Sequence, residues 1–157
     1  MPDQVDIVAD IGGTNARFAW VSKAKPQPQQ VETFACADFE HIAHAISLYL
    51  KKIGRDANEA CLAVAAPLDG DDVKLLNNHW SFNRRDLQNS LGFPVNVIND
   101  FTAQMLSVDA VVDDDLYWIG DARPVSAAEK VRAILGPGTG LGVATLTPSG
   151  DILPSEG

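Results

Sequence analysis

Glycine-rich turns between short apolar runs occur twice in this sequence, and this repeated pattern constrains the fold more than any other feature. The first turn, Gly12-Gly13, separates the β-branched run Val5–Ile11 from the alternating run Ala16–Val21. The second, Gly136–Gly142, also lies between two apolar runs. Runs of this length that stop at glycine are typical of buried strands joined by tight turns. The sequence therefore predicts two strand–turn–strand units.

The residues around the first turn suit the binding of an anion. Adjacent glycines let the backbone adopt a positive φ and approach a ligand closely. Successive N–H groups in such a turn form a concave anion site, to which Thr14 adds a hydroxyl and Arg17 a positive charge. Asp10 could hold a hydrated Mg²⁺ against phosphate oxygens. An ordinary Gly-Gly hairpin whose turn is capped by Asp10 is the alternative interpretation.

The second turn contains four glycines in seven residues, Gly136-Pro-Gly-Thr-Gly-Leu-Gly142. Such a run costs backbone entropy unless a ligand or another stretch of backbone comes close. No Lys-Ser or Lys-Thr pair follows it, and position 141 is Leu, so it matches neither a Walker A loop nor a dinucleotide fingerprint. A β-bulge or a tight hairpin is the alternative. Two such turns in one chain favour a protein that holds a polyphosphate between them.

Polar residues follow the apolar run Pro94–Ile98 at the point where it ends. Because α/β folds bind ligands at the carboxyl ends of strands, Asp100 could accept a proton from a substrate hydroxyl while Asn99 hydrogen-bonds a neighbouring one. Asp100 as the cap of the next helix is the alternative. Asn78 is a further substrate-binding candidate, because Asn77–Trp80 could present polar groups to a ligand. A turn before a packed Trp explains the same residues equally well.

The rest of the sequence predicts strands that interleave with helices. Expected strands include Val31–Cys36, after a polar loop over Lys23–Gln30, and Cys61–Ala66. Expected helices run from Asp38 to Ile53 before Gly54, from Ser81 or Asn83 to Gly92, and from Thr102 to Val111. This order predicts the α/β class, with a mixed sheet flanked by helices.

Charge and cysteine content restrict the partners. The chain has 12 Lys and Arg against 21 Asp and Glu, a formal net charge of −9, so it lacks the basic footprint that nucleic acids and anionic membranes require. No apolar run is long enough to span a membrane, and the first residues lack the features of a signal peptide. Two Cys without metal-ligand spacing suit a reducing compartment. We therefore expect a cytoplasmic protein without nucleic-acid or membrane partners.

Five segments together resemble the N-terminal part of the bacterial glucokinase family, which belongs to the hexokinase-like superfamily with the ribonuclease H-like, actin-type ATPase fold. The matching segments are Asp10–Phe18, Asn78–Phe82, Val97–Ala103, Leu135–Val143 and Pro154–Gly157. They occur in the family's order and cover essentially the whole chain. The resemblance implies ATP-dependent phosphorylation of glucose at its 6-hydroxyl, giving glucose 6-phosphate and ADP at the entry to glycolysis.

The resemblance also implies roles for individual residues. Asp100 matches the general base that takes the proton from the sugar's 6-hydroxyl, and Asn99 and Glu156 match residues that hydrogen-bond sugar hydroxyls. Residues that match the two phosphate loops are Asp10, Gly12, Gly13, Thr14, Asn15 and Arg17 in the first, and Gly138, Thr139 and Gly140 in the second. Mg²⁺ would bridge the phosphates of ATP, so positioning and charge neutralisation would supply most of the catalysis.

The resemblance further predicts the domain organisation. Family members are about twice this length, form a homodimer, and fold as a small and a large domain around a cleft. In the family, Ser155-Glu156-Gly157 continues into a second Gly and a sugar-binding His, followed by the adenosine-binding half. We therefore expect residues 1–110 to form the small α/β domain and residues 111–157 the first part of the large one, an incomplete fold. A non-catalytic sugar-binding fragment or regulatory homologue is the alternative function.

Overall fold

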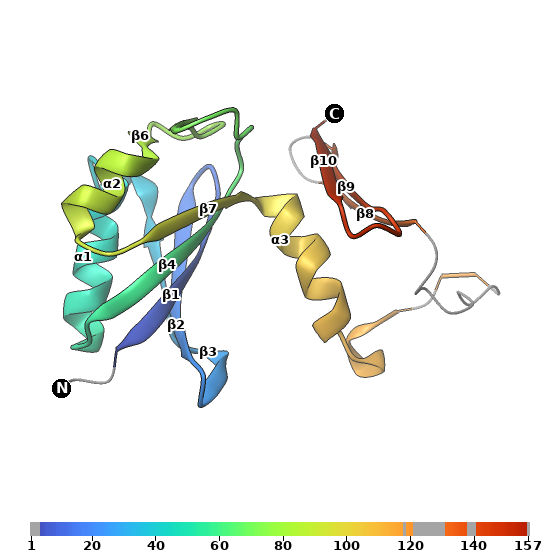
Figure 1. Ribbon diagram of the computed structural model, residues 1–157, viewed down its shortest axis with the longest axis horizontal. Coiled ribbons are helices and arrows are strands. Elements are labelled where there is room, and N and C mark those ends of the chain that lie inside the picture. The colour runs from blue at the N-terminus through green and yellow to red at the C-terminus, as the bar shows by residue number, and fades with distance from the viewer. Residues whose placement is uncertain (1–3, 118, 121–130, 138–140, 157) are drawn as a thin grey trace. The chain divides into compact units, whose positions relative to one another are not determined.

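The protein is described from a computed structural model of residues 1–157, of which the structure describes residues 4–117, 119–120, 131–137 and 141–156 (Figure 1). The chain divides into two compact units, Met1–Asp100 and Phe101–Gly157, which are described separately. The expected division into residues 1–110 and 111–157 stays a prediction. The strands and α-helices of unit 1 are β1 (Val5–Ile11), β2 (Asn15–Ser22), β3 (Lys25–Ala35), α1 (Ile42–Ile53), β4 (Ala57–Val64), β5 (Asp72–Lys74), β6 (Ser81–Asn83), α2 (Arg84–Leu91) and β7 (Val95–Asn99). Those of unit 2 are α3 (Asp100–Ser107), whose first residue lies at the boundary, β8 (Arg132–Pro137), β9 (Leu141–Leu146) and β10 (Ile152–Glu156).

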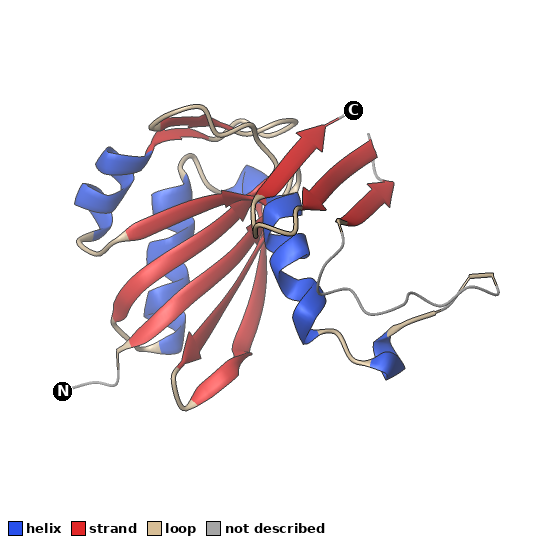
Figure 2. Ribbon diagram, turned by 45° about the vertical axis from the view of Figure 1, so that its right-hand side comes forward, coloured by secondary structure: helices blue, strands red, loops and turns tan. Residues whose placement is uncertain are grey.

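Unit 1 is built on a five-stranded mixed sheet with the strand order β3-β2-β1-β4-β7. The first three strands pair antiparallel, whereas β1, β4 and β7 are parallel to one another. Figures 1 and 2 show α1 and α2 on one face of this sheet. The predicted class, a mixed sheet flanked by helices, is therefore confirmed.

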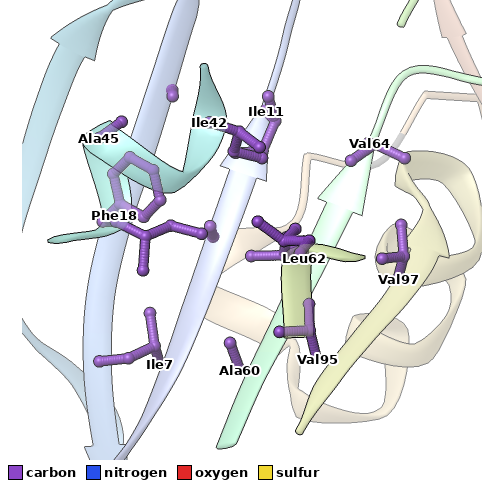
Figure 3. Packing of buried hydrophobic residues seen from close by; sticks show 14 of the residues in the cluster. Ile7, Ile11, Phe18, Ile42, Ala45, Ala60, Leu62, Val64, Val95 and Val97 are labelled. Carbon is purple, nitrogen blue, oxygen red and sulfur yellow. The ribbon is translucent and has the colours of Figure 1, made fainter. Parts of the chain in front are cut away.

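The core of unit 1 lies between this sheet and α1. Alternate residues of β1 are buried, among them Ile7 and Ile11, and the same face of β4 carries the buried Leu62 (Figure 3). Helix α1 covers them with a stripe that includes Tyr49, whose ring stacks on Phe18 at a centroid distance of 5.7 Å. The helical and strand periodicities of the sequence thus meet in one continuous apolar layer.

Helix α1 begins later than predicted. The sequence predicts Asp38 as its N-cap, but Cys36–Asp38 forms a short 3₁₀ turn, and the α-helix starts at Ile42 with His41 as its N-cap. The reason is long-range, because the indole N–H of Trp80 donates to the carbonyl oxygen of Phe39 over 3.0 Å and holds that residue extended. The helix ends as predicted, at Gly54 in the left-handed conformation with φ 63°.

The polar segment that we expected to be a loop is part of strand β3. Pairing with β2 begins at Lys25 and includes the region of Pro26 and Pro28. Proline is tolerated here because β3 is the edge of the sheet, where a missing N–H donor leaves no neighbouring strand unsatisfied. The predictions for α2 are confirmed: the Asn83 side chain caps its first turn, and Gly92 ends it with φ 81°.

Unit 2 contains a three-stranded antiparallel sheet with the order β10-β9-β8. Helix α3 starts at Asp100 and its α-helical part ends at Ser107, so both ends fall earlier than the predicted Thr102 and Val111. Within the described part of unit 2, Met105 and Ala144 are the buried apolar residues. Among the described residues, no helix is both long and apolar enough to cross a bilayer.

Candidate functional site

The predicted anion-binding turn connects β1 to β2 in unit 1. The N–H of Gly12 donates to the carbonyl oxygen of Asn15 over 2.9 Å, which closes the turn. Within the described parts of the chain, the next two N–H groups, those of Gly13 and Thr14, have no protein acceptor. Two consecutive N–H groups without an acceptor can together bind an anion. Neither Gly12 nor Gly13 adopts the positive φ that the sequence argument expected, and the anion-binding role of the turn stays a prediction.

Two opposite charges flank this turn. Asp10 and Arg17 are register partners on β1 and β2, with 3.9 Å between Arg17 Nη1 and Asp10 Oδ2. Both side chains are mostly exposed, and strand alternation directs them away from the buried face that carries Ile11. The described residues contain no group of three His, Cys, Asp or Glu that could cage a metal. A single exposed carboxylate fits a cation that keeps its water ligands, as Mg²⁺ usually does.

Asn78 lies in contact with the turn. Its Nδ2 donates to the carbonyl oxygen of Gly12 over 2.9 Å, and its Oδ1 accepts from the backbone N–H of Trp80 over 3.0 Å. Both ends of the carboxamide are therefore engaged by backbone groups. The contact with a substrate that we expected for Asn78 stays a prediction, whereas its contact with the turn is observed.

Two contacts that sequence reasoning missed, made by Asn77 and Cys36, also shape the turn. A Cβ on Gly13 would lie 3.1 Å from the carbonyl oxygen of Asn77, so this position has little room for a side chain. The N–H of Cys36 donates to the carbonyl oxygen of Thr14 over 2.8 Å. Burial raises the pKa of the Cys36 thiol, and a hydrogen bond with Asn78 acts in the opposite direction. No local sequence signal links either residue to the turn, because both contacts are long-range.

The Asn99-Asp100 pair lies at the carboxyl end of β7, and the turn lies at the carboxyl end of β1, so both are at the same end of the sheet. Ile11, Val64 and Asn99 are register partners across the three parallel strands, so Asn99 lies two strand spacings, about 10 Å, from the end of β1. The Asn99 side chain is 7% exposed, and its Nδ2 donates to the carbonyl oxygen of Ala66 over 3.4 Å. Asp100 follows as the first residue of α3 and is half-buried. The parallel strands thus bring the turn and the predicted base to the same end of the sheet, where these strands terminate.

The second glycine turn belongs to unit 2. Gly136 pairs with Gly142 across β8 and β9, and a Cβ on either glycine would overlap the ring of Phe101. Two of the four glycines are therefore explained by packing within the protein. The predicted phosphate contacts of Gly138, Thr139 and Gly140 lie outside the described residues. Glu156, the predicted sugar ligand, is the last residue of β10.

The fold of the chain is found in solved sugar kinases. A glucokinase of the ROK family from Streptomyces griseus, in complex with glucose and AMPPNP, superposes with a TM-score of 0.66 over 95% of this chain at 19% identity. The glucokinase from Balamuthia mandrillaris in complex with glucose gives a TM-score of 0.69 at 26% identity. These likenesses place the chain in the class of proteins with the actin-type ATPase fold of sugar kinases.

More similar proteins identify the family. The glucokinase family profile matches residues 7–157. The glucokinase of Chromohalobacter salexigens is 44% identical over 156 residues, which cover 96% of this chain and 48% of that protein. A glucokinase from an Antarctic psychrotroph superposes with a TM-score of 0.80 at 34% identity, over 98% of this chain and 50% of that one. The chain belongs to the glucokinase family, and it spans about half the length of the curated relatives it matches.

Proposed function

We propose that the protein transfers the γ-phosphoryl group of ATP to the 6-hydroxyl of glucose, giving glucose 6-phosphate and ADP. One observation carries this proposal: the turn after β1 and the Asn99-Asp100 pair lie at the same end of one sheet, where its parallel strands terminate. Membership of the glucokinase family supports it. Two structural relatives also support it, one in complex with glucose and the other in complex with glucose and AMPPNP.

The turn after β1 binds the phosphates in this proposal. The N–H groups of Gly13 and Thr14 donate to phosphate oxygens, and Arg17 adds a positive charge. Gly12 and Asn15 set the shape of the turn through their mutual hydrogen bond. The remaining phosphate contacts come from Gly138, Thr139 and Gly140 in the second turn. Mg²⁺, held through water near Asp10, would neutralise the charge that develops on the phosphates.

The sugar is held and activated by polar side chains at strand ends. Asp100 accepts the proton of the 6-hydroxyl as that oxygen forms its bond to phosphorus and the bond between the γ-phosphorus and the bridging oxygen of ADP breaks. Asn99 and Glu156 hydrogen-bond other hydroxyls of the sugar, and Asn78 is proposed as a further substrate contact. Positioning of the two reactants supplies most of the rate.

The cellular setting follows from the same proposal. We place the protein in the cytoplasm, at the entry to glycolysis, and we expect the full-length protein to form a homodimer. The two free cysteines, Cys36 and Cys61, and the net charge of −9 are compatible with this setting.

A coupled assay of glucose 6-phosphate formation in the full-length protein tests the role of Asp100. We expect Asp100→Asn to lower kcat by about 10²- to 10⁴-fold, because the proton acceptor is lost. Glucose affinity, measured by calorimetry, should change little. The matched control Asp86→Asn removes an exposed carboxylate in the first turn of α2 and should leave kcat unchanged. Unchanged turnover in the Asp100 variant would remove this residue from the role of base.

A second candidate function rests on the length of the chain. Because it spans about half of its curated relatives, the chain by itself could bind a sugar without phosphorylating it. The same assay on the 157-residue chain, with ATP, Mg²⁺ and glucose, separates the two functions. Turnover supports the kinase, whereas glucose binding without turnover supports the non-catalytic sugar-binding chain or regulatory homologue.

A further inference from the structure

We propose that Asn78 is a positioning residue, which aims the N–H of Gly13 at the phosphates by fixing the opposite side of the same peptide group. The proposal rests on the phosphate-binding role of the turn given above. It concerns a residue that sequence reasoning assigned either to substrate binding or to a turn before a packed Trp, and it follows from two hydrogen bonds of one carboxamide.

The geometry of a peptide group carries the first step. The carbonyl oxygen of Gly12 and the N–H of Gly13 belong to one peptide unit, and all peptide bonds in the described residues are trans. In a planar trans peptide the C=O and N–H bonds point in opposite directions. Since Asn78 Nδ2 holds the carbonyl oxygen at 2.9 Å, the N–H of Gly13 must point away from Asn78. That N–H is one of the two unpaired amides of the turn.

The flexibility of the turn makes this restraint necessary. A peptide between two glycines can rotate as a unit at little steric cost, because neither neighbour carries a Cβ. A rotated peptide would present its carbonyl oxygen to the ligand and repel phosphate. The Cys36 thiol, 3.9 Å from the same carbonyl oxygen, gives a weaker second contact on that side. The carboxamide therefore selects the one orientation that suits an anion.

Asn78 is itself held in one orientation. Its Oδ1 accepts from the backbone N–H of Trp80, so the NH₂ end of the carboxamide must face Gly12. The Trp80 side chain is buried, and its indole N–H is bound to the carbonyl oxygen of Phe39. A chain of contacts thus connects the turn to the core of unit 1, which gives Asn78 a rigid support.

Paired isosteric variants of the 157-residue chain test the proposal. Asn78→Asp keeps the acceptor for Trp80 but removes the donor to Gly12. Asn77→Asp is the matched control, since it adds the same charge beside Gly13, where Asn77 approaches closely without hydrogen-bonding the Gly12 carbonyl. We expect AMPPNP with Mg²⁺ to bind about tenfold more weakly to Asn78→Asp than to Asn77→Asp. Equal affinities of the two variants would overturn the proposal.

Hydrogen exchange supplies a readout that does not depend on nucleotide. The N–H of Gly12, which closes the turn, should exchange about tenfold faster in Asn78→Asp than in the wild-type chain or in Asn77→Asp. Unchanged exchange would overturn the proposal. If AMPPNP binds the wild-type chain without shifting the amide signals of Gly13 and Thr14, the phosphate-binding role of the turn fails, whereas the effect of Asn78 on the turn is still decided by exchange.

A neutral variant covers the case in which the aspartate variant does not fold. Asn78→Ser keeps a short side-chain acceptor for the N–H two residues on but cannot reach the carbonyl of Gly12. It should fold with an unchanged circular dichroism spectrum and show the same faster exchange at Gly12. A Ser variant that folds and retains wild-type exchange and AMPPNP affinity would contradict the role of Asn78.

Discussion

The two units of the chain use the same local pattern but differ in what covers it. In unit 1 the antiparallel strands β1, β2 and β3 continue into β4 and β7 on the other side of β1, and two helices cover one face. In unit 2 the antiparallel strands β8, β9 and β10 form the whole sheet in the described residues. Leu135 and Leu153 there are 65% and 58% exposed. A strand–glycine turn–strand unit therefore acquires a core only from the elements that pack on it.

The glycines of the two turns differ in what a side chain at their positions would meet. Gly13 faces the backbone of Asn77, and Gly142 faces the ring of Phe101. A side chain at position 142 would overlap the Phe101 ring, whereas a Cβ at position 13 would crowd the carbonyl oxygen of Asn77 at 3.1 Å. The N–H groups of Gly13 and Thr14 in the first turn have no acceptor among the described residues, which leaves them available for an anion.

Matched leucine truncations should give the largest contrast between the units. Leu62→Ala removes a fully buried side chain from the core of unit 1 and should lower the free energy of unfolding by about 2–5 kcal/mol. Leu135→Ala removes a mostly exposed side chain from unit 2 and should change it by less than about 0.5 kcal/mol. Guanidinium chloride unfolding, followed at amides of each unit, measures both. Equal losses would contradict the contrast in burial.

Alanine substitution of a turn glycine should destabilise unit 2, by less than Leu62→Ala destabilises unit 1. Gly142→Ala places a methyl group where the Phe101 ring lies, which should destabilise unit 2 by about 1–3 kcal/mol. The control, Gly12→Ala, meets the carbonyl oxygen of Asn15 at an ordinary 3.6 Å. The expected signature is faster hydrogen exchange of β8 and β9 in Gly142→Ala, without a change in β1. Unperturbed β8 and β9 amides would refute the packing explanation of this glycine.

Alkaline pH should act on unit 1 through Tyr49. Burial, together with the nearby charge of Glu32, raises the pKa of Tyr49 to about 12. The folded state therefore keeps a proton that the unfolded state loses near pH 10, so the contribution of Tyr49 to stability is constant below pH 10 and is lost between about pH 10 and 12. In the Tyr117→Phe background, Tyr49 is the sole tyrosine, and its ultraviolet absorbance reports the titration. Titration near pH 10 in the folded chain would contradict this account.

Acidic pH should have the smallest effect, on unit 2. A hydrogen bond from Arg132, followed by the charge of that guanidinium, holds the pKa of Asp109 below its usual range. The stability from this pair is present above the unfolded pKa of about 4 and is lost as pH falls through the lower folded value. Because the Asp109 side chain is mostly exposed, Asp109→Asn should shift the unfolding midpoint of unit 2 only slightly. A large shift would mean that the pair is a major support of unit 2.

Local patterns predicted much of the fold, and long-range contacts account for what they missed. The ends of α1 and α2 were predictable, because Gly54, Asn83 and Gly92 act on their own helices. The start of α1 was not, since it depends on a hydrogen bond between Phe39 and Trp80, residues far apart in the sequence. Strand β3 was missed because its prolines are tolerated only at a sheet edge, a position that local composition does not reveal.

The features of the candidate site also divide into those that local sequence predicts and those that depend on long-range contacts. The sequence was sufficient to predict the strand-end positions of Gly12-Gly13 and Asn99-Asp100, which depend on local strand breaks. It was not sufficient to predict that Asn78 contacts the turn, because this contact spans 66 positions of the chain. The glycines at 136 and 142 were interpreted as space for a ligand or backbone, whereas the structure assigns that space to the Phe101 side chain.

The central claim is that the turn after β1 binds phosphate. The most direct test is to follow the chemical shifts of the backbone amides by NMR during a titration with AMPPNP and Mg²⁺. In the 157-residue chain we predict the largest shifts at Gly13 and Thr14, whose N–H groups have no acceptor among the described residues. The chemical shift of the Gly92 amide, at the end of α2, should not change. Saturable binding of AMPPNP that leaves Gly13 and Thr14 unmoved would contradict the account.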